Sequence, residues 1–267
     1  MFILTLVAGL GVLLTMVSGA VLTYAFANSL PLAPVGIFSV LGHRFIAEGA
    51  GTLVVLLALW ITFGGQPARV KILGWIAVAL VAAEALIGRV SAPLSAGLGF
   101  LHAVFAQLII AMLAHIVIYT WSGWKKEAVP VPNTGRLSLT GMANYAVGAL
   151  LLQVTLGAAY RHGLLSVVWH ILGAFIVVIF ALGIVVTATQ VPANQPLKPP
   201  AIWLVVLLGV QVTLGMILIS ISTPPEHPTF ASIIVATHVL VGSSALATGV
   251  INSLLVRRSV RAAAAAS

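Results

Sequence analysis

Long apolar stretches recur along this chain, and they constrain its fold more than any other feature. An α-helix needs about 20 apolar residues to cross the roughly 30 Å hydrocarbon core of a bilayer. Stretches of this kind lie at residues 3–26, 40–63, 71–92, 98–121, 140–160, 164–189, 201–222 and 230–255. Only 6% of the 267 residues are charged, whereas a water-soluble domain carries about a quarter. The sequence therefore predicts an all-α integral membrane protein with eight transmembrane helices.

The charge and cysteine content exclude several classes of function. The net charge is +8, but the basic residues lie in short segments between the apolar stretches, where they report orientation in the bilayer. The lipid bilayer is thus an expected partner and nucleic acid is not. The chain has no cysteine, which excludes disulfides, thiolate metal sites, iron–sulfur clusters and covalent c-type haem attachment. Any metal chemistry must rest on histidine.

The basic residues divide between the two sides of the predicted bundle. Those on one side predict that this side is cytoplasmic, with both termini inside the cell and the protein in the inner (cytoplasmic) membrane. They are nine of the twelve Lys and Arg residues: Arg69, Lys71, Lys125, Lys126, Arg136, Lys198, Arg257, Arg258 and Arg261. The other three, Arg44, Arg89 and Arg161, sit at the outer ends of predicted helices. Because a charge at membrane depth needs a partner, these three suggest a bound anion.

A short motif repeats at the outer ends of alternate helices. It reads Gln153-Val-Thr-Leu-Gly157 and Gln211-Val-Thr-Leu-Gly215, with a variant at 84–88 and a fainter copy at 15–19. After each copy come a short loop and a helix with a histidine in its outer half. These histidines are His43, His102, His170 and His238. The repeating unit is therefore a helical hairpin, used four times.

Two hairpins make a four-helix bundle, so the chain is expected to form two pseudo-symmetric bundles. We predict an N-terminal bundle at 1–122, a cytoplasmic linker at 123–139, a C-terminal bundle at 140–256 and a basic cytoplasmic tail at 257–267. Each bundle then holds two of the repeated histidines at similar depth. One imidazole on each side, about 2 Å from the metal, is the ligand arrangement of a bis-histidine haem iron.

Alternatives exist for each of these side chains. A lone histidine in a membrane helix often donates to a backbone carbonyl of a neighbouring helix, but four at equivalent positions favour metal ligation. The three outer arginines are expected to pair with haem propionates, with snorkelling as the alternative. His115 is interpreted as a packing or hydrogen-bonding residue. His162 and His227 are interpreted as solvated residues of outer loops, with the lining of an entrance as the alternative, more so for His162 because it follows Arg161.

The order of these motifs resembles the haem A synthase family of cytochrome oxidase assembly. The resemblance rests on the Gln-Val-Thr-Leu-Gly repeat, on the His43-Arg44 pair and on Pro93 followed by His102, and it spans all the predicted helices. It implies that the C-terminal bundle holds a haem b cofactor, with His170 and His238 as iron ligands. It also implies that the N-terminal bundle receives haem O as substrate, with His43 and His102 facing the iron, and that the C8 methyl group is oxidised to a formyl group. Gln153 and Gln211 are assigned to the cofactor site.

This chain departs from the family pattern in two places. Residues 25–38 lack the cysteine pair that many bacterial members carry in the first outer loop. The family also has a glutamate three residues before the helix 2 histidine, where this chain has Val40. Two carboxylates within the predicted helices, Glu48 and Glu84, are the candidates to replace this acid. Glu84 takes the place of the later glutamines, so the alternatives for it are their structural hydrogen bond or a pair with Arg89. Glu48 lies about 7.5 Å deeper than His43, roughly 140° around the helix.

The sequence-based expectation is therefore a haem A synthase-like membrane oxidoreductase. Its electron donor would be a quinol or a ferredoxin-like protein, and haem O synthase or other membrane subunits are possible partners. The alternative is a non-catalytic cytochrome with two b haems, the second haem b in place of haem O, or an electron-transfer or anchor subunit of a respiratory complex. A haem-free transporter built on repeats is a third reading.

Overall fold

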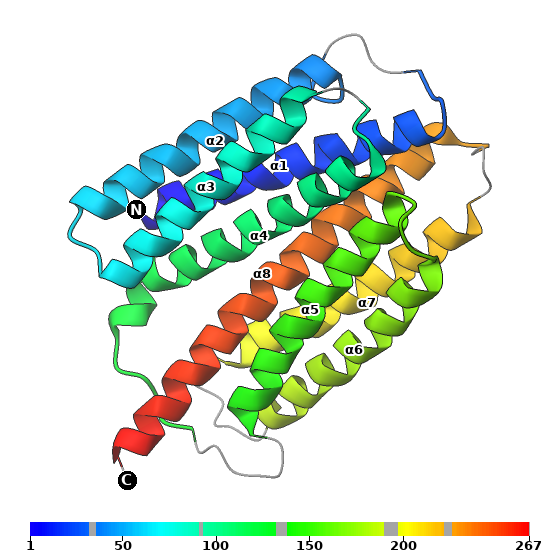
Figure 1. Ribbon diagram of the computed structural model, residues 1–267. Helices are drawn as coiled ribbons and strands as arrows, with labels where there is room; N and C mark the ends of the chain where they lie inside the picture. Colours follow the sequence, from blue (N-terminus) through cyan, green and yellow to red (C-terminus); the bar gives the residue numbers. More distant parts are fainter. Residues whose placement is uncertain (32–35, 91–92, 132–137, 190–196, 222–225, 267) are drawn as a thin grey trace.

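A computed structural model describes residues 1–31, 36–90, 93–131, 138–189, 197–221 and 226–266 (Figure 1). In this part of the chain there are eight long α-helices and no strand, and all eight are apolar and long enough to span a membrane. The expectation of an all-α, multi-pass membrane protein is confirmed. The helices are α1 (Phe2–Ala27), α2 (Val40–Phe63), α3 (Ala68–Val90), α4 (Ala96–Thr120), α5 (Leu139–Arg161), α6 (Val167–Thr189), α7 (Lys198–Ser220) and α8 (Pro228–Ala266).

The helix boundaries lie within three residues of the sequence-based prediction, except at the end of α8. Helix α7 begins at Lys198 and includes Pro199 and Pro200 in its first turn, where proline is tolerated because the first N–H groups of a helix have no intrahelical partner. Helix α8 continues to Ala266, so the expected tail at 257–267 is helical as far as the structure describes it. The segment after Val256 contains no glycine or proline that would end a helix.

The helix contacts form two closed rings. In the first ring, α1 contacts α2, α2 contacts α3, α3 contacts α4, and α4 returns to α1. In the second ring, α5, α6, α7 and α8 contact one another in the same cyclic order. Contacts of α8 with α1 and α4, and of α4 with α5, join the two rings (Figure 1). Helices α4 and α8 occupy equivalent places in the two rings, so the interface is built about a pseudo-symmetric pair.

Polar side chains contribute to this interface. Gln107 on α4 donates through Nε2 to Ser243 Oγ on α8 at 3.0 Å. Ser243 is fully buried, and its hydroxyl lies 3.9 Å from Met16 Sδ on α1. Ser243 therefore lies between the two rings.

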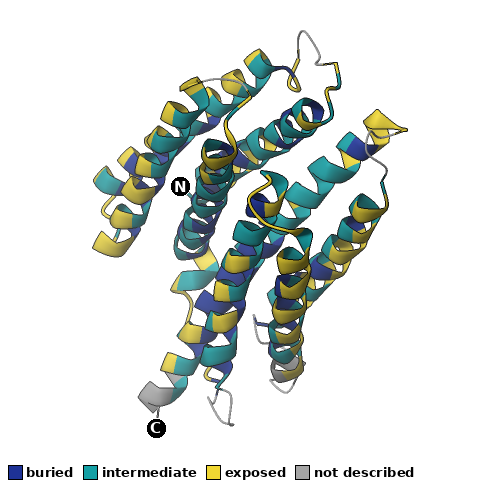
Figure 2. Cartoon of the chain, turned by 45° about the vertical axis from the view of Figure 1, so that its right-hand side comes forward, coloured by how far each residue is buried: buried dark blue, intermediate teal, exposed yellow. Residues whose placement is uncertain are grey.

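Large apolar side chains cover much of the outer surface, as expected for a protein surrounded by lipid. Figure 2 shows exposed residues along the outer helices. Phe63 on α2 and Phe175 and Ile179 on α6 are among the most exposed, at 84%, 65% and 67%. In water such a surface would associate or precipitate, whereas in a bilayer it contacts acyl chains.

The end of the bundle opposite the repeated histidines is held together by the linker and α8. Ser122–Lys125 forms a short 3-10 helix, η1. Arg258 on α8 donates to the carbonyl of Gly123 at 3.2 Å and lies over the ring of Trp124, 4.9 Å from its centroid. The backbone N–H of Val131 donates to the carbonyl of Ser259 at 3.2 Å. The remainder of the predicted linker, at 132–137 and including Arg136, lies outside the described residues.

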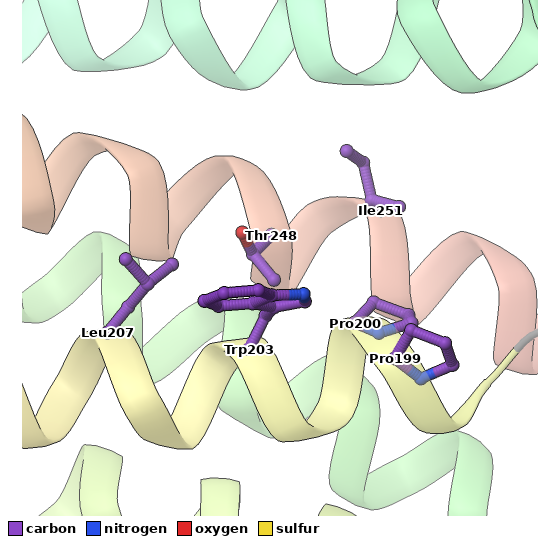
Figure 3. Close-up of a pocket in the computed structure, with 6 residues that line it drawn as sticks. All are labelled: Pro199, Pro200, Trp203, Leu207, Thr248 and Ile251. Atoms are coloured by element: carbon purple, nitrogen blue, oxygen red, sulfur yellow. The ribbon is translucent and has the colours of Figure 1, made fainter.

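A mainly apolar pocket of about 400 Å³ lies between the first turns of α7 and the second half of α8 (Figure 3). Its lining residues are Pro199, Pro200, Trp203, Leu207, Thr248 and Ile251. None of these six is a repeated histidine, so the pocket is separate from the candidate site.

Candidate functional site

The repeated histidines lie in the first halves of the even-numbered helices, and local sequence fixes where these helices begin. In α2, Ser39 is the N-cap and its hydroxyl accepts a hydrogen bond from the Gly42 N–H at 2.9 Å. The Gly36 carbonyl packs against Gly42 so closely that a Cβ at this position would overlap it. A serine cap followed by a glycine that admits the preceding turn thus sets the position of His43 at the start of the helix.

The structure brings the four histidines together as two pairs of nearly equal geometry. The ring centroids of His43 on α2 and His102 on α4 are 6.4 Å apart, with 67° between the ring planes. Those of His170 on α6 and His238 on α8 are 6.3 Å apart, at 64°. A metal bound about 2 Å from one nitrogen of each of two opposed imidazoles puts their centroids about 6.2 Å apart, since each centroid lies about 1.1 Å behind its nitrogen.

Each of these histidines packs its Cε1 atom against the glycine of the repeat on the preceding helix. A Cβ added at Gly157 would lie 2.8 Å from Cε1 of His170, and one added at Gly19 would lie 3.0 Å from Cε1 of His43. The corresponding distances are 3.4 Å for Gly215 and His238 and 3.8 Å for Gly88 and His102. The repeated glycine therefore makes room for the imidazole, most tightly in the hairpins of α1 and α5.

The residue four places before each glycine also lies beside the histidine. The rings of His43, His170 and His238 lie against the backbones of Thr15, Gln153 and Gln211, respectively. Nδ1 of each of these rings is buried, and among the described residues it makes no well-formed hydrogen bond, so the adjacent carbonyl is the acceptor within reach. An Nδ1–H directed at a backbone carbonyl leaves Nε2 as the ligating nitrogen, which is the usual arrangement at metal sites.

In the second ring, glutamine side chains reach the histidines. Gln211 Nε2 lies 3.0 Å from His238 Nε2, and Gln153 Nε2 lies 3.4 Å from His170 Nε2 and donates to the His170 carbonyl at 2.9 Å. Gly173 and Gly242 on the facing helices leave the space that these amides occupy. In this orientation the amides donate to the imidazole lone pairs, so an iron atom would replace these hydrogen bonds.

In the first ring, a carboxylate takes the place of the amide. Glu84 Oε2 on α3 lies 2.8 Å from His102 Nδ1. Glu48, the other candidate acid, is exposed on α2 and has no contact with the repeated histidines among those found in the described residues. Val40 is the first residue of α2. Of the two acids proposed to replace the missing glutamate, the structure brings Glu84 to the histidine pair and leaves Glu48 away from it.

Two of the three outer arginines bond to backbone beside the histidines. Arg161 at the end of α5 donates through Nη2 to the Ala20 carbonyl on α1 at 2.6 Å. Arg44 donates through Nη2 to the Gly88 carbonyl on α3 at 3.1 Å. Arg89 is exposed at the end of α3. None of the three pairs with a carboxylate in the described part of the chain, so the expected pairing with propionates stays a prediction.

The structure corrects the interpretation of His162 as a solvated residue of an outer loop. His162 follows Arg161 at the end of α5, and its ring packs against Gly99 on α4, where an added Cβ would lie 2.5 Å from Nδ1. Burial, the charge of Arg161 and the nearby His102 lower the pKa of His162 to about 4. The second ring thus places His162 near His102 of the first pair, whereas Arg161 bonds to α1 and lies near His238 of its own ring. The only sequence signal was that these two residues directly follow the repeat.

The remaining histidines are as predicted or lie apart. His115 on α4 bonds through Nδ1 to the Ala111 carbonyl at 2.8 Å, which confirms its expected hydrogen-bonding role. His227 is exposed before α8.

The residues fit a haem better than a bare metal ion. Among the described residues, no group of three or more His, Cys, Asp or Glu side chains is arranged to hold an ion. A haem iron needs only two protein ligands because the porphyrin supplies the others. The paired rings, the glycines that cradle them and the buried Nδ1 atoms are together the features of such a ligand set.

Substitution of the cradle glycine tests this packing. We expect Gly157→Ala to displace His170, because overpacking costs about 1–3 kcal/mol, which corresponds to a loss of haem affinity of about tenfold. Gly148→Ala on the same helix is the matched control, since its Cβ would meet nothing within 4 Å. Absorbance titration of each purified variant with haemin measures the affinities. Equal affinities in the two variants would show that the ring of His170 does not need this cradle.

No protein-family model matches the chain, and a search of curated proteins finds no match. The residues and their geometry therefore carry the functional assignment.

Proposed function

We propose that this membrane protein binds one haem in each ring and acts as a haem A synthase-like oxidoreductase. The observation that carries the proposal is the near-identity of the two histidine pairs, at 6.4 and 6.3 Å between ring centroids. Two imidazoles in apolar surroundings, cradled by small residues, suit a flat macrocycle held between helices. The resemblance of the repeat and of the His43-Arg44 pair to the haem A synthase family adds the reaction class.

The two rings are assigned different roles. In the C-terminal bundle, 140–256, His170 and His238 would ligate haem b. In the N-terminal bundle, 1–122, His43 and His102 would hold haem O while its C8 methyl is oxidised to a formyl group. The bound haem iron supplies the redox chemistry. The chain orients the imidazoles through Gly19, Gly88, Gly157 and Gly215, and Arg44 and Arg161 place guanidinium groups near the pairs, where propionates would be received.

The membrane orientation and the partners are part of the same proposal. Basic residues gather at the end of the bundle opposite the histidines, in α3, η1 and α8. By the positive-inside rule this end faces the cytoplasm, which gives a protein of the cytoplasmic membrane with both termini inside. Oxidation of the methyl group to a formyl group removes four electrons and adds one oxygen atom, so a quinol or ferredoxin-like donor would have to act together with dioxygen as the oxidant. Haem O synthase is the expected source of the substrate.

Co-expression with a haem O source tests the activity. The expected result is haem A, or its hydroxylated precursor, detected by mass in extracts of cells that express the chain. A haem-loaded protein that yields neither product would contradict the proposed reaction.

A second function, a non-catalytic cytochrome with two b haems, is favoured by Val40, which stands where the family has its acid. Reduced-minus-oxidised spectra separate the two functions. Two low-spin b haems retained through purification support the cytochrome, whereas one tight haem b and one exchangeable site support the synthase.

A further inference from the structure

The two histidine pairs have similar geometry but different partners. Glu84 is the carboxylate that contacts a repeated histidine, and its side chain is 15% exposed while that of His102 is 28% exposed. The three other glutamates of the chain, Glu48, Glu127 and Glu226, are exposed. A buried carboxylate beside a candidate iron ligand is costly unless it accepts a hydrogen bond, and Nδ1 of His102 is the donor within reach.

Comparison of the four hairpins shows that only one of them has a carboxylate at this position of the repeat. Glu84 stands four residues before Gly88, at the place that Thr15, Gln153 and Gln211 hold in the other hairpins. Those three residues have neutral side chains. The glutamine amides also approach Nε2 of their histidines, whereas Glu84 approaches Nδ1. The first ring thus places a carboxyl group beside Nδ1 of one of its candidate ligands, and the second ring does not.

The group that accepts the Nδ1–H bond affects how strongly an imidazole binds a metal. A carboxylate that accepts the Nδ1–H bond fixes the tautomer, directs the lone pair of Nε2 toward the metal and raises the basicity of the ring. A more basic ligand stabilises ferric over ferrous iron, so hydrogen bonding to an axial histidine tunes the reduction potential of a haem.

We propose that Glu84 is a positioning residue that makes the first haem site electronically different from the second, by holding His102 as a strong donor that favours the ferric state. This inference rests on the proposed haem ligation and deepens it, because it assigns the lower reduction potential to the site in the first ring. The second pair, whose Nδ1 atoms face backbone carbonyls, then has the higher potential.

Haemin titration and spectroelectrochemistry test the inference. A His170→Ala/His238→Ala double variant removes the second pair, so that haemin reports on the first pair alone. In this background, Glu84→Gln should weaken ferric haem binding by about tenfold relative to ferrous binding. That ratio corresponds to an upward shift in midpoint potential of about 59 mV for a one-electron couple. Glutamine should be tolerated because the repeat itself carries it at 153 and 211.

Glu127→Gln in the same background is the control, because it removes an equal charge from an exposed position after η1, at the opposite end of the bundle. Equal potentials in Glu84→Gln and Glu127→Gln, with haemin bound normally, would contradict this inference and leave the proposed function intact. If the first pair takes up no haemin in the double variant, the ligation itself is wrong, and the inference is overturned together with the proposed function.

Discussion

Alanine at His170 or at His238 should abolish stable haem binding by the second ring. The two rings of this pair lie 6.3 Å apart, so each supplies one of the two axial ligands in the proposed site. Loss of one ligand leaves a five-coordinate or empty site, and we expect an affinity loss of at least about 100-fold, the upper range seen when only a supporting residue is removed. The haem content of the purified protein and the low-spin spectrum measure this loss.

His227→Ala is the matched control for this experiment. His227 directly precedes α8, the helix that carries His238, but it is exposed and belongs to neither pair. It should retain the wild-type haem content and spectrum. If His170→Ala, His238→Ala and His227→Ala all purify with the same haem content, then the second pair does not ligate haem.

Much of the fold follows from the sequence because a bilayer imposes a fixed length on apolar helices. Helix α2 has the predicted bounds, and every other boundary except the end of α8 agrees within three residues. Helix α7 begins three residues earlier than predicted, at Lys198, because prolines are compatible with a first helical turn. Helix α8 passes Val256 because alanine-rich sequence continues a helix until a breaker or a partner ends it.

The candidate site was predictable only where the repeat encodes it. Equivalent positions in four hairpins predicted which histidines would be neighbours, since pseudo-symmetry places equivalent residues at equivalent depth. Contacts between rings have no such signal. The bond from Arg161 to Ala20 joins residues 141 apart in sequence, and the packing of His162 on Gly99 depends on how α5 docks against α4. Neither contact follows from periodicity or composition within one helix.

The contact between Glu84 and His102 could be predicted from the sequence only in part. The sequence placed the carboxylate at the repeat position next to the histidine hairpin. Periodicity, however, does not specify whether such a side chain meets Nδ1, Nε2 or the backbone, and the repeats differ in this respect. Side-chain rotamers and the space left by small residues decide it. Gly242, four residues after His238, leaves space for the Gln211 amide. The equivalent position on α4, four residues after His102, is Ala106, which leaves less space.

Alanine at His102 should eliminate product formation while leaving the second ring loaded. In the proposed reaction the first pair holds haem O, so loss of either imidazole removes the iron anchor that fixes the C8 methyl group for oxidation. Positioning of this kind contributes a large share of a rate enhancement, and we expect haem A formation to fall at least about 100-fold. The second ring does not depend on His102 and should retain its one low-spin haem.

His115→Ala on the same helix separates ligation from helix packing. His115 bonds to the Ala111 carbonyl within α4 and lies 13 residues beyond His102, so it should keep both product formation and haem content. Mass detection of haem A together with haem stoichiometry then distinguishes the two functions. Loss of product with one haem retained in His102→Ala supports a synthase, whereas a fall from two b haems to one, with no product in the wild type, supports the cytochrome. Unchanged haem content and spectrum in His102→Ala would contradict haem ligation by the first pair, under either function.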